Sequence, residues 1–307
     1  MNRPVDAIRP AAIDGVGPST VRLPQDVTGG LLDFLDRRFP DVGRAVWRAR
    51  LQAGTVRDAH DRALALDAEA PAGGLVHYFR DLPDEPRIPF EAEILYRDAH
   101  LLVADKPHFL PTIPSGRFVR ESLLVRLKQA TGIEALTPLH RLDRETAGLV
   151  LFSVDPATRG AYTALFAERQ IEKTYEALAP LRDDTRGPLT RRSRLAAAEP
   201  FFRMQEVPGE PNAETRIEPL ASVGVGTAGE AIARYRLSPR TGRKHQLRVH
   251  MAALGMPIVN DRWYPALLDD AVDDFRRPLK LLARQLRFVD PLTAVLRVFD
   301  SRRRLDL

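Results

Sequence analysis

Five residues with charged or titratable side chains occupy one short segment, directly before an apolar run. The segment is LHRLDRETAGLVLF, at 139–152, and the five are His140, Arg141, Asp143, Arg144 and Glu145. The apolar run, GLVLFSV at 148–154, is short and continuous, which is typical of a buried strand. A carboxylate held at the end of such a rigid element can attack as a nucleophile or remove a proton. The alternative is a solvated loop in which Asp143 only pairs with the neighbouring arginines.

A second group of polar residues lies far downstream, in LSPRTGRKHQLRVHMAALGMPI at 237–258. We expect a helix there from about Lys244 to Gly255, because Gly and Pro follow its last turn. Three apolar residues share the stripe that would face the core: Leu247, Met251 and Leu254. Arg248 leaves the helix on another face and is therefore suited to reach a carboxylate elsewhere in the fold. The alternative is that the basic residues at 243–248 form a solvated helix start.

Between these groups, the chain continues as a helix and then a strand. Asp155 and Pro156 are typical of a helix start, and ATRGAYTALFAERQ carries the helical pattern. The following IEKTYEALA, at 171–179, alternates as a strand does. The alternation places Lys173 and Tyr175 on the same face, about 7 Å apart. Packing at the edge of the core is the simplest role for such a tyrosine.

Composition divides the whole chain into four parts. Residues 1–20, rich in Pro, Gly and Ala, predict a flexible leader. Residues 21–80 contain two helical patterns, LLDFLDRRF and AVWRARLQAG, and two short strand-like runs, so they predict a small domain. Residues 81–92, DLPDEPRIPFEA, have the composition of a linker. The large domain should span 93–307 and open with two strands around a turn.

Length, charge and composition limit the class of protein. The 307 residues favour one large domain with a smaller one, and the net charge of +5 favours a polyanionic partner. The absence of cysteine excludes disulfides and thiolate metal sites. No apolar run approaches the ~18 residues of a membrane span, and no signal-peptide pattern is present. We therefore expect a cytoplasmic protein without a membrane partner, and a monomer by default. His245 and His250 are poorly spaced for one helical face, so we expect no metal.

Three segments resemble the RluA-like family of RNA pseudouridine synthases: HRLDRETAGLVLF, KTYEA and TGRKHQLRVHMAALGMPIVNDRWY. The first is close to the family's most diagnostic string, H-R-L-D-x-x-T-x-G. LLVADKPHFLP and LLARQLRFVDP resemble further family segments, and the likeness covers roughly residues 90–300 in the family's order. The N-terminal residues are similar, more weakly, to a small S4-type RNA-binding domain, without its V-x-V-N-G strand. Asn260 stands where the family usually has Gly before Asp261, which concerns loop geometry.

The resemblance implies an α+β catalytic domain with a mixed, mostly antiparallel sheet, preceded by a small S4-like α/β domain. It implies an isomerase that converts uridine in rRNA or tRNA to pseudouridine without metal or other cofactor. Asp143 would be the essential catalyst, and Arg248 its ion-pair partner, buried with it. Tyr175 would stack on the uracil, an interaction worth roughly 1–3 kcal/mol.

Substrate-binding residues should surround these three and contact a nucleotide that has left its helical stack. The candidates are Arg141, Lys173, Arg243, Lys244 and His245. Two other classes of protein remain open: a non-catalytic RNA-binding or ribosome-assembly factor on the same fold, and a metal-dependent hydrolase. The intact HRLDRET string argues against a mere binder, which has no need of a buried Asp–Arg pair.

Overall fold

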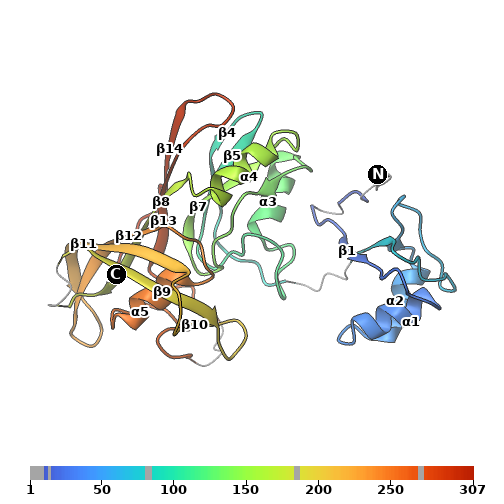
Figure 1. Ribbon diagram of the computed structural model, residues 1–307, viewed down its shortest axis with the longest axis horizontal. Coiled ribbons are helices and arrows are strands. Elements are labelled where there is room, and N and C mark those ends of the chain that lie inside the picture. Colours follow the sequence, from blue (N-terminus) through green and yellow to red (C-terminus); the bar gives the residue numbers. More distant parts are fainter. Residues whose placement is uncertain (1–9, 13–14, 80–84, 183–186, 269–272) are drawn as a thin grey trace. The chain divides into compact units, whose positions relative to one another are not determined.

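The chain folds into two compact units, Met1–Glu85 and Pro86–Leu307, drawn in Figure 1 from the computed structural model. None of the helices in the described residues is both long and apolar enough to cross a membrane. The described residues are 10–12, 15–79, 85–182, 187–268 and 273–307.

The described residues of the N-terminal unit form two helices and a three-stranded antiparallel sheet ordered β1-β3-β2. Its elements are β1 (Ser19–Arg22), α1 (Leu31–Arg38), α2 (Arg44–Gln52), β2 (Val56–Arg57) and β3 (Leu75–Tyr78). Both helices coincide with the predicted apolar patterns, and they pack with the sheet around the buried Trp47. Strand β1 starts inside the expected leader, because Ser19 and Thr20 pair with Tyr78 and His77. The likeness of this unit to an S4-type domain stays a prediction.

The second half of the expected linker packs onto the larger unit. Ile88 is buried, and its backbone N–H donates to the Glu121 carboxylate at 2.7 Å. The Arg126 guanidinium donates to the carbonyl oxygens of Ile88 and Phe90, at 2.7 and 2.6 Å. Prolines exclude regular structure from this stretch, but they leave its carbonyl groups free to accept from a side chain. Residues 81–84 lie outside the described residues.

The larger unit is built on one 11-stranded sheet. Its strands are β4 (Glu93–Arg97), β5 (Leu101–Lys106), β6 (Thr137–Pro138), β7 (Ala147–Ser153), β8 (Glu172–Pro180), β9 (Leu189–Ala197), β10 (Met204–Val207), β11 (Ala213–Val225), β12 (Ala231–Pro239), β13 (Leu281–Val289) and β14 (Leu296–Asp300), and its helices are α3 (Leu123–Thr131), α4 (Arg159–Ala167) and α5 (Gln246–Ala253). The order is β10-β9-β11-β12-β8-β13-β7-β5-β4, with β14 beside β13 and β6 beside β7. Strands β13 and β7 run parallel, and the other pairings are antiparallel among the residues described. The expected α+β class with a mostly antiparallel sheet is confirmed.

Strand β7 is buried on both faces, which accounts for its continuous apolar sequence. Val150 and Phe152 belong to the core cluster that contains side chains of α3, whereas Leu149 and Leu151 belong to the cluster that contains side chains of α4. The two helices therefore cover opposite faces of the sheet at β7. Burying one such apolar side chain contributes roughly 1.5–3 kcal/mol, so this strand is a rigid support for the loop before it.

Helix α4 begins at Arg159, later than the predicted start at Asp155. The Asp155 carboxylate instead accepts the backbone N–H of Ala157 at 2.9 Å and closes a turn before the helix. Asp favours both such turns and helix caps, so composition alone does not separate the two.

Candidate active site

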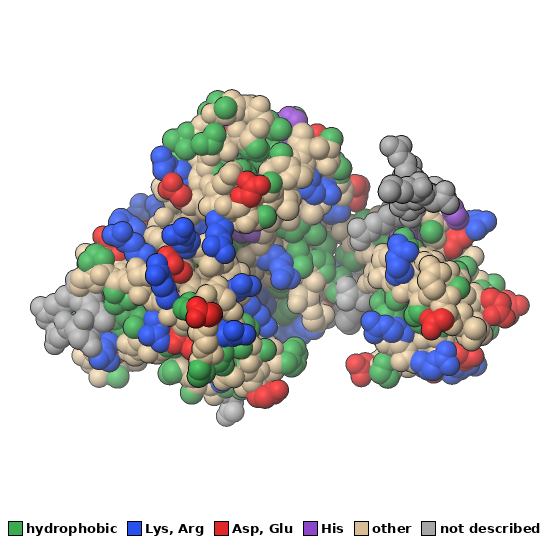
Figure 2. All heavy atoms as spheres, viewed as in Figure 1, with side chains coloured by type: hydrophobic (Ala, Val, Ile, Leu, Met, Phe, Trp, Pro, Cys, Tyr) green, Lys and Arg blue, Asp and Glu red, His purple; other side chains and the backbone are tan. Residues whose placement is uncertain are grey.

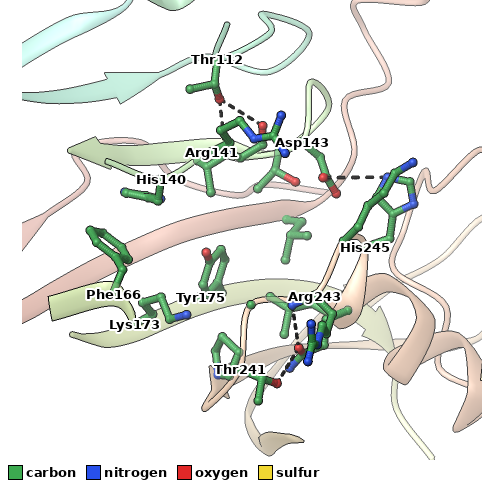
Figure 3. A pocket seen from close by; sticks show the side chains of 18 of the residues that line it. Thr112, His140, Arg141, Asp143, Phe166, Lys173, Tyr175, Thr241, Arg243 and His245 are labelled. Atoms are coloured by element: carbon green, nitrogen blue, oxygen red, sulfur yellow. Dashed lines mark hydrogen bonds and ion pairs between the residues drawn. The ribbon is translucent and has the colours of Figure 1, made fainter. Parts of the chain in front are cut away.

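A pocket of about 760 Å³ lies where the loop before β7, strand β8 and the segment leading into α5 meet. The structure brings all eight predicted site residues to the wall of this pocket (Figure 3). They are Arg141, Asp143, Lys173, Tyr175, Arg243, Lys244, His245 and Arg248. Residues from three distant parts of the sequence therefore converge on one cavity.

Asp143 is positioned by the backbone on either side of it. Thr112 donates its hydroxyl to the carbonyl oxygen of Leu142 at 3.0 Å and accepts the N–H of the same residue at 3.1 Å. The N–H of Thr146 donates to the carbonyl oxygen of Asp143 at 3.1 Å. These bonds fix the loop at the mouth of β7, and the Asp143 side chain keeps 26% of its surface exposed, in the pocket.

Lys106, which was not among the predicted site residues, donates a hydrogen bond to the same loop. It is fully buried, and its Nζ donates to the carbonyl oxygens of Pro107, Leu110 and Arg144 at 3.0, 2.7 and 3.1 Å. Burial lowers the pKa of Lys106 to about 7, although the negative charges of Glu145 and Asp143 oppose the shift. The sequence feature that could have indicated Lys106 is its position at the end of a strand that reads as buried.

Arg248 reaches the site from α5, but its main partner is not the one expected. Its Nε and Nη2 donate to the two carboxylate oxygens of Asp261, both at 2.8 Å. Its Nη1 is 3.5 Å from Asp143 Oδ2 and 3.8 Å from Glu145 Oε2. The Arg248 side chain is 1% exposed. Burial works against its charge, yet the hydrogen bonds to Asp261 raise the pKa of the guanidinium above its ordinary value. Arg248 therefore forms the expected ion pair with Asp143 at 3.5 Å, but its shorter, bidentate pair is with Asp261, and Asp143 is less buried than expected.

Asp261 sits in a tight turn that explains the departure noted at Asn260. Asn260 has a φ of 64°, in the left-handed region that Gly and Asn tolerate best. The Asp261 carboxylate also accepts the N–H groups of Trp263 and Tyr264, at 2.9 and 3.2 Å. Both aromatic rings lie against the guanidinium of Arg248, 4.7 and 5.3 Å from its central carbon. Asp261, Trp263 and Tyr264 were within the recognised segment, but nothing local in the sequence assigned them a partner.

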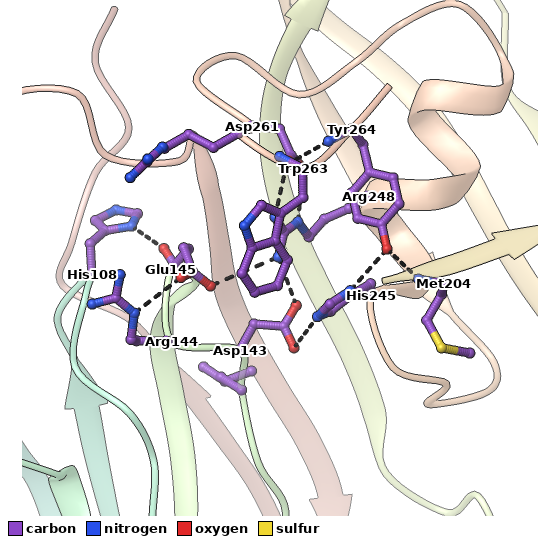
Figure 4. A network of polar contacts seen from close by, with 12 residues as sticks. His108, Asp143, Arg144, Glu145, Met204, His245, Arg248, Asp261, Trp263 and Tyr264 are labelled. Carbon is purple, nitrogen blue, oxygen red and sulfur yellow. Dashed lines mark hydrogen bonds and ion pairs between the residues drawn. The ribbon is translucent and has the colours of Figure 1, made fainter. Parts of the chain in front are cut away.

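His245 lies beside Asp143 and is almost enclosed, with 3% of its side chain exposed (Figure 4). Its Nε2 is 3.8 Å from Asp143 Oδ1, and its Nδ1 is 2.9 Å from the Tyr264 hydroxyl. Burial and then the charges of Arg248 and Lys244 lower the pKa of His245 to about 3, so the ring is neutral. The φ of His245 is 53°, which is outside the helical region. Helix α5 therefore begins at Gln246, two residues later than the expected Lys244.

Tyr175 projects from β8 into the pocket, on the same side as Lys173 (Figure 3). It packs against the core clusters on both sides of the site. Burial, and then the nearby charge of Asp143, raise the pKa of the Tyr175 phenol above its ordinary value. The hydroxyl therefore keeps its proton, and the ring presents a fixed aromatic surface to the pocket.

Basic side chains form the outer wall of the pocket, and Arg141, Arg243 and Lys244 are exposed. Lys and Arg side chains gather on the face of this unit that Figure 2 draws. The backbone N–H of Arg243 donates to the side-chain oxygen of Gln246 at 3.1 Å, which ties the basic loop to the start of α5. Arg169 also lines the pocket and was not predicted. This wall suits the phosphate groups of a nucleic acid.

Histidines offer no metal site in the part of the chain that the structure describes, where no cluster of His, Cys, Asp or Glu has suitable geometry. His140 accepts the backbone N–H of Leu151 through Nε2 at 3.1 Å. His250 contacts the hydroxyls of Ser193 and Thr215 at 3.0 and 2.9 Å. Both rings are therefore engaged in holding the scaffold.

Comparison with known proteins identifies the family. The model of the RNA pseudouridylate synthase family matches residues 100–253. The tRNA pseudouridine synthase C of Vibrio parahaemolyticus is 34% identical over 225 residues, which cover 67% of this chain and 87% of that protein. The dual-specificity RNA pseudouridine synthase RluA of Haemophilus influenzae is 31% identical over 213 residues, covering 68% and 92%.

A solved structure agrees with these sequence matches. Human RNA Pseudouridylate Synthase Domain Containing 1 is 25% identical and superposes with a TM-score of 0.58, covering 72% of this chain and 86% of that one. The residues matched by the family model, 100–253, lie within the unit that carries the pocket. The chain belongs to the RluA-like family of RNA pseudouridine synthases, isomerases that convert uridine in RNA to pseudouridine.

Proposed function

We propose that Asp143 is the catalytic carboxylate of this isomerase. The reaction breaks the bond between N1 and C1′, turns the uracil, and joins C5 to C1′, while C5 loses a proton and N1 gains one. One observation carries the proposal: the Asp143 carboxylate lines the pocket with 26% of its side chain exposed, and its shortest ion pair, with Arg248 Nη1, is 3.5 Å long. The oxygens are thus free to attack the ribose or to remove a proton from it.

The surroundings of Asp143 support a reactive carboxylate. Burial raises the pKa of Asp143 above its ordinary value, and the charge of Arg248 opposes the rise, as does that of Lys106. Burial makes a carboxylate more basic, whereas a neighbouring cation keeps it ionised. We propose that this balance leaves Asp143 ionised near neutral pH and more reactive than a solvated carboxylate.

We propose further that Tyr175 stacks on the uracil during its rotation. The uracil must stay in the pocket after its bond to the ribose has broken, and a flat ring holds a base without specifying one orientation. The target nucleotide must leave its helical stack to reach Asp143. Arg141, Lys173, Arg243 and Lys244 are proposed to hold the phosphates around it, with His245 beside the catalytic carboxylate.

A structured tRNA or rRNA is the proposed substrate, acted on in the cytoplasm by a monomer. One relative is named a tRNA pseudouridine synthase and another a dual-specificity RNA pseudouridine synthase, which supports tRNA as one candidate and more than one class of RNA as another. No cofactor is proposed, because the isomerisation is redox-neutral and the leaving base is also the attacking group. The S4-like character of the N-terminal unit is proposed from its sequence alone.

Pseudouridine mapping of total RNA tests both the reaction and the assigned catalyst. Carbodiimide-dependent reverse-transcription stops would be compared in cells with and without the gene. We expect the deletion to remove a defined stop, and wild-type protein or the exposed-site control Asp274→Asn to restore it. Asp143→Asn should restore nothing while still binding the RNA; restoration by this variant would refute the role of Asp143.

A further inference from the structure

His245 has a geometry that the proposed reaction does not yet use. Its ring is almost enclosed, and its Nε2 faces Asp143 Oδ1 at 3.8 Å. Its backbone adopts a left-handed conformation that non-glycine residues rarely occupy. Such conformations persist where the surroundings hold them, and they gather at functional sites. The surrounding structure therefore holds the His245 ring beside the Asp143 carboxylate.

The charge of the His245 imidazole and its hydrogen-bond partners determine which of its two nitrogens is protonated. The imidazole is neutral, because burial and then the charges of Arg248 and Lys244 lower its pKa to about 3. A neutral imidazole carries one proton, either on Nδ1 or on Nε2. The hydrogen bond at one nitrogen decides which nitrogen is protonated.

Tyr264 supplies that hydrogen bond. Its hydroxyl oxygen accepts the backbone N–H of Met204 at 2.8 Å, and it lies 2.9 Å from Nδ1 of His245. Among the described residues, Nδ1 is the acceptor within reach of the hydroxyl proton. Burial raises the pKa of Tyr264, so the hydroxyl keeps this proton. If Tyr264 donates to Nδ1, the imidazole proton lies on Nε2, which faces Asp143.

Two effects disfavour the other tautomer, in which Nδ1 of His245 carries the proton. It would aim the lone pair of Nε2 at the ionised Asp143, and it would leave the Tyr264 proton without an acceptor among the described groups. An unpaired buried hydroxyl is costly. Both effects favour the tautomer of His245 that is protonated on Nε2.

We propose that Tyr264 selects the Nε2–H tautomer of His245, and that this N–H orients Asp143 by donating to Oδ1 in the RNA complex. Arg248 faces the other oxygen, Oδ2. A cation on one oxygen and a neutral donor on the other fix the plane of the carboxylate without a second positive charge. His245 and Tyr264 are then positioning residues, and the inference rests on the proposed role of Asp143.

A set of variants tests the hydrogen-bond chain from Tyr264 through His245 to Asp143, which we call the relay. Gln can place an amide N–H near the position of Nε2–H, so His245→Gln should keep most of the rate that His245→Leu loses. Tyr264→Phe removes the hydroxyl and retains the ring. Tyr162→Phe is the matched control, because its buried hydroxyl contacts Asp290, away from the pocket.

Single-turnover release of tritium from RNA labelled at uridine C5 gives the rate, and filter binding gives the RNA affinity. We expect Tyr264→Phe to slow the reaction about tenfold, as for loss of one hydrogen bond to a charged group, with unchanged RNA affinity. The acid limb of its pH–rate profile should move to higher pH, because Asp143 loses a donor to its charged form. The charged and titratable groups facing Tyr264, His245 and Asp143 are Lys106, Glu145, Tyr175, Arg203, Lys244, Arg248 and Asp261.

Two results distinguish the relay from a structural role. In the His245→Gln background, Tyr264→Phe should have no further effect on the rate, because Tyr264 acts only through the imidazole. The ¹⁵N shifts of His245 in the wild-type protein should report a protonated Nε2. A protonated Nδ1, or an unmoved acid limb in Tyr264→Phe, would overturn the inference even where Asp143→Asn is inactive. Activity in Asp143→Asn would overturn the proposed function itself.

Discussion

Arg248 stands 3.5 Å from Asp143 but gives its two short hydrogen bonds, at 2.8 Å each, to Asp261. Asp261 thereby holds the guanidinium close to the Asp143 carboxylate, and Arg248 and Asp143 do not form a bidentate pair. A bidentate Asp143–Arg248 pair would occupy both oxygens and lower their basicity. Asp261 therefore keeps a positive charge near Asp143 while the Asp143 oxygens remain outside a bidentate hydrogen-bonded pair.

Removing the charge of Asp261 should damage both folding and catalysis. We expect Asp261→Asn to lose about 3 kcal/mol of unfolding free energy, because it breaks a fully buried ion pair. Arg248 should then turn toward Asp143, and the acid limb of the pH–rate profile should move to lower pH. Denaturant titration and single-turnover kinetics measure the two effects. Asp274→Asn, in an exposed ion pair, is the control and should retain stability and rate; an equal loss there would rule out the assigned cause.

The raised pKa of Asp143 predicts how the stability of the fold depends on pH. A carboxyl with a raised folded-state pKa contributes stability that is present below the unfolded value, near 3.8, and is lost as pH rises through the folded pKa. Asp143→Asn lacks this loss. Its melting temperature, relative to that of the wild type, should therefore be higher at pH 7 than at pH 4. A difference independent of pH would contradict the raised pKa.

The stacking role of Tyr175 predicts different outcomes for two substitutions. Tyr175→Phe keeps the ring and should bind target RNA as the wild type does. Tyr175→Leu should lose roughly 1–3 kcal/mol of binding free energy, the value of one base stack. Filter binding would also use RNA that lacks the target base as the control. If Leu weakens binding of both RNAs equally, Tyr175 does not contact that base.

The exposed basic wall predicts an effect that depends on salt rather than on sequence. Lys244→Ala should weaken binding to all RNAs and reduce the slope of log affinity against log salt by about 1, if Lys244 neutralises one phosphate. Arg276→Ala is the control, since Arg276 is exposed and paired with Asp274 outside the pocket. Titrations at several salt concentrations give the slopes. An unchanged slope for Lys244→Ala would remove this residue from the phosphate contacts.

Local sequence was sufficient for the elements that carry the site. The continuous apolar run of β7, the alternation of β8 and the apolar stripe of α5 each depend on residues a few positions apart. Those patterns, with the family resemblance, placed Asp143, Tyr175 and Arg248 in one pocket. Boundaries were less exact: α4 and α5 begin later than expected, because Asp155 closes a turn and His245 adopts a left-handed backbone.

Only the tertiary structure decided how the side chains are paired. The choice of Asp261 over Asp143 as the main partner of Arg248 depends on a turn after α5 that aims one carboxylate at two guanidinium nitrogens. Lys106 and Tyr264 act on loops that are distant in sequence, and no local pattern records such a contact. Periodicity follows from neighbours along one element, whereas hydrogen-bond partners follow from where separate elements meet. The sequence by itself therefore determined which residues reach the pocket, and the packing of loops against α5 decided what each of them faces there.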